Sequence, residues 1–188
     1  MTSYSDRLET GDPALYLRRT QPDEGPELFN FVTAADNYPH LCTFEQWPVG
    51  FTREQAEAQV AGVCRRMTGP GDEIMQYRLR AGEDDRMVGC VTLFNHVGHS
   101  AVLGYYVAAA ACGNNYATMG ARRILDYAAQ EWSLEEVVCR ISPHNTPSLR
   151  VAAKLGASGG ELAILQTDSG LVKKQIWKIP MHGGGGWT

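Results

Sequence analysis

The sequence has few cysteines, and they follow no recognisable spacing. There are five, an odd number, and no two of them are separated by just two residues. This pattern argues against a disulfide framework and against a zinc site, and it is typical of a protein kept in a reducing compartment. We therefore expect a cytoplasmic protein that holds no metal. The five are Cys42, Cys64, Cys90, Cys112 and Cys139.

Long apolar runs and an excess of positive charge are also lacking. No apolar run approaches the ~18 residues that a membrane-spanning helix needs. The first residues show no basic segment followed by an apolar core, so we expect no secretory signal. The net charge of −4 argues against non-specific binding to nucleic acid. Neither a membrane nor a nucleic acid is therefore expected as a partner.

What the chain does contain fits one globular domain. It has 188 residues, of which 44% are hydrophobic and 20% charged, and this is enough to build a core. The final stretch, "MHGGGGWT", holds four successive glycines, whose ordering has a high entropic cost. We predict a single domain over residues 1–180 and a flexible tail over 181–188.

Hydrophobic periodicity predicts seven strands and four helices. Three strand patterns between residues 74 and 109 are separated by turns of hairpin length, so they are expected to form an antiparallel meander. The segment 36–50 is rich in aromatic and turn-forming residues and shows little periodicity. The strands are predicted at 14–19, 74–80, 87–95, 101–109, 136–142, 159–166 and 171–180. The helices are predicted at 24–35, 52–67, 116–132 and 145–156.

Two of these helices carry recognisable ends. Thr52 and Gln55 have the spacing of a capping box, in which each side chain accepts a hydrogen bond from the other's backbone N–H. In the last helix, Thr146 is expected as the N-cap, Pro147 at the first helical position, and Gly156 at the end.

A short polar turn, Gly113-Asn114-Asn115, stands directly before the helix at 116–132. The first N–H groups of a helix lack partners and form the positive end of its dipole, so a turn of small residues there can hold a phosphate. Glycine offers no side chain, and asparagine tolerates a positive φ. The turn matches neither GxxxxGK[ST] nor GxGxxG. An ordinary surface turn is the alternative.

Together with the order of elements, three motifs resemble the GNAT superfamily of N-acetyltransferases, and most of all its ribosomal-protein N-terminal acetyltransferases, the Rim-type group. "CGNNYA" at 112–117 stands where that family has Gln/Arg-x-x-Gly-x-Gly/Ala. "NTPSLRVAAKLGA" at 145–157 resembles its Asn-x-x-Ser helix, and "NYPHLCTFEQWP" at 37–48 resembles its substrate-side loop. The resemblance covers residues 14–179.

The resemblance implies an α/β (α+β) fold with a mixed, mostly antiparallel central sheet of about seven strands. This sheet is splayed in the middle and flanked by about four helices. It also implies acetyl-CoA as co-substrate and an acetyl transfer to a primary amine by direct attack. A homodimer is one possible assembly in such folds.

The resemblance also assigns site residues. The pantetheine arm of CoA would pair with the strand that ends near Val107, and Asn145 would hold that arm or the strand end. The Ser148 hydroxyl would protonate the departing CoA thiolate, so Asn145 and Ser148 are the predicted catalytic residues. The full set of predicted cofactor-binding residues is Val107, Cys112, Gly113, Asn114, Asn115, Tyr116, Ala117, Thr118, Asn145 and Ser148.

Two positions depart from the family pattern. Cys112 replaces Gln or Arg, and Asn115 replaces a glycine. Asn115 is expected to keep the backbone shape, but its side chain has to point away from the phosphate. We expect weakened CoA binding rather than none. Cys112 is interpreted as a small hydrophobe beside the turn and not as a catalytic thiol, because no companion His–acid pair is visible in the sequence.

No general base is evident either. Residues 87–115 contain no Asp, Glu, Lys or Arg, and Val102 stands where the family often has a Glu. The remaining candidates are His96, His99, His144 and Glu45. The two histidines of the "NHVGHS" turn are interpreted as solvated loop residues.

A weak base restricts the acceptor. A lysine amine has a pKa of about 10.4 and an α-amine one of about 7.7–8.0, so deprotonating the lysine near neutral pH costs roughly 3–4 kcal/mol more. An α-amine, on a protein N-terminus or a small amino compound, is favoured. The segment 36–50 either caps the core or forms a wall of the groove that binds the acceptor. In the second case, Glu45 would face the ammonium group of the incoming amine. Its predicted acceptor-binding residues are Tyr38, His40, Phe44, Glu45 and Trp47. Acetylation of an antibiotic or metabolite amine, and a non-catalytic CoA-binding module, are the alternatives.

Overall fold

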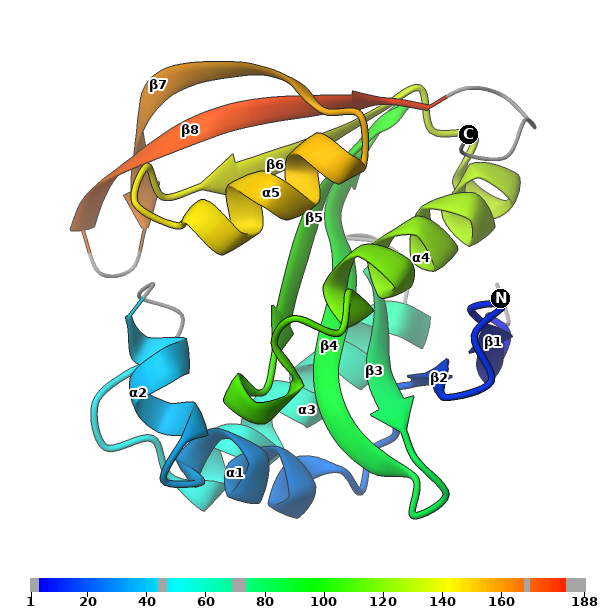
Figure 1. The fold of residues 1–188 in the computed structure, drawn as a ribbon, viewed down its shortest axis with the longest axis vertical. Coiled ribbons are helices and arrows are strands. Elements are labelled where there is room, and N and C mark those ends of the chain that lie inside the picture. Colours follow the sequence, from blue (N-terminus) through cyan, green and yellow to red (C-terminus); the bar gives the residue numbers. More distant parts are fainter. Residues whose placement is uncertain (1–3, 44–46, 69–73, 168–169, 182–188) are drawn as a thin grey trace.

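The computed structural model of the chain describes residues 4–43, 47–68, 74–167 and 170–181. Its eight strands form one sheet in the order β1-β2-β3-β4-β5-β6-β8-β7 (Figure 1). The strands are β1 Arg7–Glu9, β2 Leu15–Arg19, β3 Met75–Ala81, β4 Arg86–Val97, β5 Ser100–Val107, β6 Glu136–Ile141, β7 Ser158–Thr167 and β8 Gly170–Pro180. The helices are α1 Gly25–Thr33, α2 Asn37–Cys42, α3 Arg53–Thr68, α4 Tyr116–Trp132 and α5 Thr146–Lys154, with a 3₁₀ turn η1 at Ala109–Ala111.

The predicted mixed, mostly antiparallel sheet is confirmed. Strands β3, β4 and β5 form the expected antiparallel meander. Strands β5 and β6 run parallel, and every other neighbouring pair in the described sheet is antiparallel. The Gly-rich tail predicted at 181–188 lies, from residue 182 onward, outside the described residues.

The sequence-based count of elements was short by one strand and one helix. Strand β1 has only three residues, too few for a periodicity to emerge, and it forms by pairing with β2. Helix α2 lies inside the segment that was predicted to lack regular structure. It has six residues, and it buries Asn37 and Leu41, so tertiary packing rather than local propensity accounts for it.

Smaller corrections concern element ends. The strand predicted to reach residue 109 stops at Val107, and the chain turns through η1. The capping box of α3 is confirmed, because Thr52 N–H donates to Gln55 Oε1 and Gln55 N–H to Thr52 Oγ1. The N-cap of α5 is Asn145 and not Thr146, since the Asn145 side chain accepts the bond from a backbone N–H of the first turn.

Two hydrophobic clusters cover the two faces of the sheet. The larger one contains the apolar stripe of α4, including Ile124 and Leu125. The smaller one joins Leu28 of α1 to Val60 of α3. Strand β4 contributes to both, with Val91 in the larger cluster and Cys90 in the smaller, as the alternation of side chains along a strand requires. Within the described ranges, no helix combines the length and the apolar character needed to cross a bilayer.

The sheet opens in its middle. Strand β5 pairs with β6 only from Ser100 to Leu103. Beyond Leu103, β5 pairs with β4 alone, and β6 pairs with β8 (Figure 1). The predicted splay between two central strands is thus confirmed, and it leaves the edge of β5 from Gly104 to Val107 without a strand partner on the β6 side.

Candidate active site

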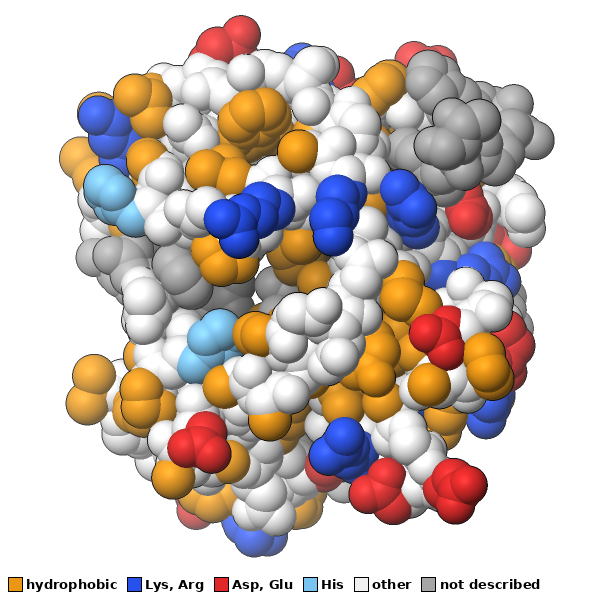
Figure 2. All heavy atoms as spheres, viewed as in Figure 1, with side chains coloured by type: hydrophobic (Ala, Val, Ile, Leu, Met, Phe, Trp, Pro, Cys, Tyr) orange, Lys and Arg blue, Asp and Glu red, His pale blue; other side chains and the backbone are white. Residues whose placement is uncertain are grey.

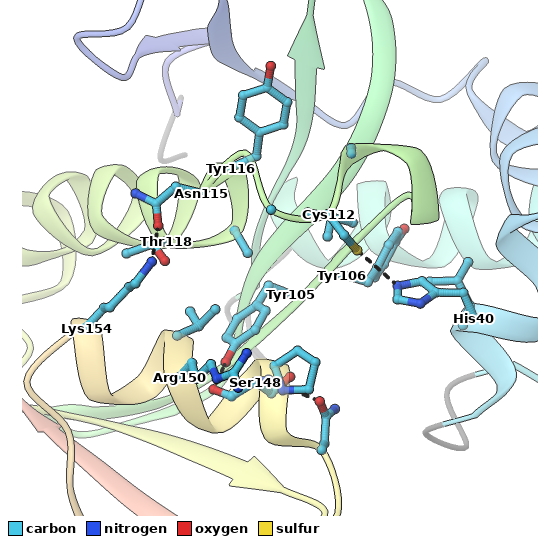
Figure 3. Close-up of a pocket in the computed structure, with 18 residues that line it drawn as sticks. His40, Tyr105, Tyr106, Cys112, Asn115, Tyr116, Thr118, Ser148, Arg150 and Lys154 are labelled. Carbon is cyan, nitrogen blue, oxygen red and sulfur yellow. Dashed lines mark hydrogen bonds between the residues drawn. The ribbon is translucent and has the colours of Figure 1, made fainter.

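A cavity of about 290 Å³ lies at this opening, on the face where Figure 2 shows a hollow. Four parts of the chain wall it: α2, the end of β5, the turn that leads into α4, and α5 (Figure 3). The described lining is His40, Leu41, Tyr105, Tyr106, Val107, Ala111, Cys112, Gly113, Asn115, Tyr116, Ala117, Thr118, Asn145, Pro147, Ser148, Arg150, Val151 and Lys154. Of the predicted cofactor-binding residues, all except Asn114 lie in this lining.

The turn before α4 has the backbone shape that the sequence predicted. Asn115 is left-handed, with φ 62°, and Gly113 has φ 88°. Asn115 is the N-cap of α4, and its side chain makes no capping bond, so it does not satisfy the first N–H groups of the helix. A Cβ at Gly113 would meet nothing within 4 Å, so the approach to these N–H groups is open. Such a helix start can receive an anion.

The two asparagine side chains of this turn are both engaged. Lys154 Nζ, on α5, donates to Asn115 Oδ1 at 2.9 Å (Figure 3). Asn114 Nδ2 donates to the Ala111 carbonyl at 3.3 Å. Asn115 therefore reaches toward α5 and does not fold over the N–H groups of its own helix.

The start of α5 forms the opposite wall. Asn145 is buried, and its Oδ1 accepts the Ser148 N–H at 3.1 Å. The Tyr105 hydroxyl donates to the Ser148 carbonyl at 3.0 Å, which ties β5 to α5. Burial raises the pKa of Tyr105, so this hydroxyl stays a donor at neutral pH. Asn145 thus has a structural task as helix cap, and it orients the turn that carries Ser148.

Cys112 has a companion that the sequence did not reveal. Its Sγ lies 3.6 Å from His40 Nε2 on α2, although the two residues are far apart in the chain. Burial raises the pKa of the Cys112 thiol, and no Asp or Glu belongs to the described lining. The pair therefore holds a neutral thiol at physiological pH and lacks the activated thiolate of a nucleophilic cysteine.

Behind the cavity lies a buried aromatic and charged wall. Tyr106 packs edge-on against Trp47, with ring centroids 5.6 Å apart, and at a tilt against Phe31. Its hydroxyl accepts a hydrogen bond from Arg78 NH1 at 3.1 Å. Arg78 is only 1% exposed, so a full positive charge lies inside the protein directly behind this wall.

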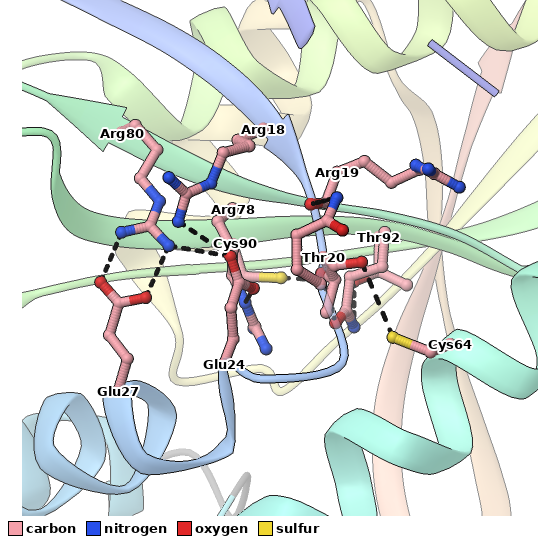
Figure 4. A network of polar contacts seen from close by, with 12 residues as sticks. Arg18, Arg19, Thr20, Glu24, Glu27, Cys64, Arg78, Arg80, Cys90 and Thr92 are labelled. Carbon is pink, nitrogen blue, oxygen red and sulfur yellow. Dashed lines mark hydrogen bonds and ion pairs between the residues drawn. The ribbon is translucent and has the colours of Figure 1, made fainter. Parts of the chain in front are cut away.

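That charge belongs to a buried network (Figure 4). Glu24, the N-cap residue of α1, accepts from Arg78 Nε at 3.1 Å and from Arg80 NH2 at 2.9 Å. Arg80 also pairs with Glu27 of α1. Buried charges are tolerated only when they are paired in this way. The network fixes α1, and with it the wall around Tyr106, on β3. The sequence signal that was overlooked is the pair of arginines at alternate positions of one predicted strand.

The predicted acceptor-binding residues are placed in different surroundings. His40 lines the cavity. Trp47 is buried in the core behind it. The Tyr38 hydroxyl donates to the Pro48 carbonyl and accepts the Gly50 N–H, both at 3.0 Å, so it holds its own segment together. The other two predicted residues, Phe44 and Glu45, lie outside the described residues. A role in acceptor binding stays a prediction for all five.

None of the other candidate histidines lines the described cavity. His96 lies in β4 and stacks on Trp132, with ring centroids 4.5 Å apart, so its interpretation as a solvated loop residue was wrong. His99 Nδ1 lies 3.0 Å from the Ser133 carbonyl. His144 is exposed in the turn before α5. No group of three or more His, Cys, Asp or Glu in the described part of the chain could hold a metal ion.

Comparison with known proteins gives a family match over most of the chain. A family model described as an acetyltransferase (GNAT) domain matches residues 14–158. The Bacillus subtilis protein named Probable N-acetyltransferase YjcK is 32% identical over 88 residues, which are 45% of this chain and 49% of that protein. Uncharacterized N-acetyltransferase YnaD, also from Bacillus subtilis, is 27% identical over 107 residues, 56% of this chain and 59% of that protein. The chain spans about half the length of the curated relatives it matches.

Solved structures share the fold at low identity. Ribosomal-protein-S5-alanine acetyltransferase from Vibrio fischeri has a TM-score of 0.79 at 15% identity, covering 93% of this chain and 96% of that one. Mycobacterium smegmatis RimJ, in complex with CoA-disulfide, has a TM-score of 0.77 at 21% identity, covering 93% of this chain and 87% of that one. These likenesses establish the fold.

The charge network behind the cavity predicts a large loss of stability for Glu24→Gln. The variant leaves two buried guanidinium groups short of a counter-charge, which we expect to lower the free energy of unfolding by about 3–5 kcal/mol. Glu27→Gln is the matched control and should cost less, because the Glu27 side chain is 37% exposed. Urea denaturation measures both. A loss below about 1 kcal/mol for Glu24→Gln would contradict the assigned role.

The raised pKa of Cys112 predicts slow alkylation at neutral pH. A raised pKa means less thiolate at pH 7, so iodoacetamide should label Cys112 more slowly than an unstructured cysteine peptide. The rate should keep rising with pH beyond 9. Peptide mass spectrometry follows the labelling over time. A rate that levels off below pH 8 would mean that His40 activates the thiol.

Proposed function

The chain belongs to the acetyltransferase (GNAT) family, and from this premise we propose that it transfers an acetyl group from acetyl-CoA to a primary amine. The neutral amine attacks the thioester carbonyl directly, a C–N bond forms, and the C–S bond breaks. The nitrogen loses one proton and the departing thiolate takes one up, so the products are an amide and CoA thiol. The observation that carries the proposal is the cavity between the separated strands, which runs from the open edge of β5 to the uncapped start of α4.

The residues present fit such a co-substrate. The backbone of β5 from Gly104 to Val107 lacks a strand partner on the cavity side and can bond the amides of the pantetheine arm. Residues 116–118 begin α4 and line the same cavity, and the N–H groups of a helix start suit a diphosphate. Mycobacterium smegmatis RimJ, which shares the fold, is described in complex with CoA-disulfide.

Ser148 is the proposed proton donor to the departing thiolate. It lies in the first turn of α5 and in the cavity lining. Two bonds hold its backbone, from Asn145 on one side and Tyr105 on the other. The negative charge on sulfur grows as the C–S bond breaks, so the hydroxyl acts most strongly in the transition state.

The acceptor is an α-amine, on the N-terminus of a protein or peptide. The described lining contains no carboxylate that could deprotonate a lysine amine. His40, on α2, is the only histidine of the described lining. Small amino compounds remain the second class of acceptor, and a cytoplasmic location and a homodimer remain predictions.

The acceptor class is tested with a panel of amines at pH 7 and pH 9. The panel contains peptides with free and with blocked N-termini, lysine peptides and small amino compounds, and mass spectrometry locates the acetyl group. We expect α-amine products already at pH 7, because an α-amine is partly neutral there. Faster acetylation of a lysine ε-amine at pH 7 would overturn the assignment. Binding of acetyl-CoA without turnover of any amine would instead support a non-catalytic module.

The role of Ser148 predicts that Ser148→Ala lowers kcat by a factor of about 10² or more, with a smaller change in the KM for acetyl-CoA. Thr146→Ala is the matched control, because Thr146 is an exposed hydroxyl residue in the same helical turn that does not line the cavity. Thiol release at saturating amine gives both constants. An unchanged kcat under rate-limiting chemistry removes Ser148 from the mechanism.

A further inference from the structure

The cavity is positively charged in a protein that is negatively charged overall. Its described lining contains two permanent cations, Arg150 and Lys154, and no Asp or Glu, although the chain carries a net charge of −4. Both cations come from α5, four residues apart, so they lie on one face of that helix. Figure 2 shows Lys and Arg side chains in a row over α5 and α4, along the upper edge of the hollow.

Within the part of the chain that the structure describes, no carboxylate neutralises these charges. The hydrogen-bond partner of Lys154 is a neutral amide, that of Asn115. Neither Arg150 nor Lys154 forms an ion pair with a carboxylate of the described residues. Arg78 and Arg80 offer the contrast, because both are paired with Glu24 behind the same cavity. Uncompensated like charges that line one cavity attract an anion into it.

We propose that Lys154 and Arg150 are the phosphate-binding cations of this site. They receive the phosphate groups of the CoA nucleotide, and Lys154 faces the diphosphate. The inference rests on the proposed function. The turn before α4 carries no positive side chain, because residues 87–115 contain no Lys or Arg. In this proposal, α5 supplies the positive charge that binds the phosphates.

The position of Lys154 supports the diphosphate as its target. Its Nζ lies 2.9 Å from the side chain of Asn115, the N-cap of α4, and so beside the uncapped N–H groups of that helix. A phosphate bound to those N–H groups comes within reach of the ammonium. Phosphate oxygens accept stronger hydrogen bonds from a cation than a neutral amide does, so the bond to Asn115 is exchanged for one to the ligand.

The neighbouring helix holds this part of α5 in place. Arg122 of α4 donates from NH2 to the Lys154 carbonyl at 2.9 Å. The bond links the last turn of α5 to α4. Arg122 does not belong to the described lining, so its part is to position α5.

The test compares ligands with and without phosphates on the whole chain. Isothermal titration measures Kd for acetyl-CoA, for its 3′-dephospho form, and for S-acetylpantetheine. We expect Lys154→Met to raise Kd roughly tenfold for both nucleotide ligands and to leave S-acetylpantetheine unchanged. Arg150→Met should weaken acetyl-CoA binding in the same range. Lys173→Met is the matched control, because Lys173 is an exposed lysine on β8 away from the lining, and it should bind like the wild type.

Asn115 offers a second pair of variants, Asn115→Asp and Asn115→Gly, because both replacements tolerate the positive φ at this position. Asn115→Asp places a carboxylate against Lys154 and the phosphates, so acetyl-CoA binding should weaken by roughly tenfold or more. Asn115→Gly releases Lys154 and suits the positive φ, so binding should be equal or tighter. Lys154→Arg keeps the positive charge, so it should bind acetyl-CoA with most of the affinity that Lys154→Met loses.

The outcomes separate this inference from the proposed function. If the wild type binds acetyl-CoA and the Met variants bind it equally well, the phosphate assignment is wrong and the transferase proposal stands. An equal loss for S-acetylpantetheine would also overturn it, since that would show a structural effect. A loss confined to ligands with the 3′-phosphate would overturn the diphosphate assignment of Lys154. If the wild type does not bind acetyl-CoA at all, the proposed function itself fails.

Discussion

The parting of β5 from β6 after Leu103 is the constraint on which the rest of the site depends. Because the two strands run parallel, their carboxyl ends lie on the same side of the sheet. The helix that follows each strand, α4 after β5 and α5 after β6, therefore begins beside the gap (Figure 1). Open strand backbone, an uncapped helix start and the capped turn of Ser148 converge there. The bonds from Tyr105 to the Ser148 carbonyl and from Lys154 to Asn115 then hold them together. A ligand or water must satisfy the exposed backbone groups of β5.

Around this opening, the positively charged side chains fall into two groups, one buried and paired with carboxylates and one exposed in the cavity. Behind the wall of Tyr106, two arginines are fully buried and are held by Glu24 and Glu27, so their charge stabilises α1 against the sheet. In front of it, Arg150 and Lys154 are exposed and have no carboxylate partner among the described residues. The first arrangement makes the scaffold rigid, and the second leaves a positive potential for an incoming anion.

Most of the fold could be predicted from the sequence, because its long elements carry strong local patterns. The capping box of Thr52 and the stripe of α4 depend on residues three or four apart. The Asn115 turn was predictable as well, since few residues tolerate a positive φ. The missed features depend on distant contacts. Two contacts arise only once the chain is folded, that of His40 with Cys112 and that of Lys154 with Asn115. Helix α2 likewise forms only through packing against the rest of the protein.

The most direct measurement of the central claim is a crystal structure of the protein with CoA bound. The account predicts the pantetheine arm along the β5 edge from Gly104 to Val107. It also predicts the diphosphate on the N–H groups of residues 116–118, with Lys154 turned from Asn115 to a phosphate oxygen. CoA bound elsewhere, or bound in the cavity with the β5 edge still open and the Lys154–Asn115 bond intact, would contradict it.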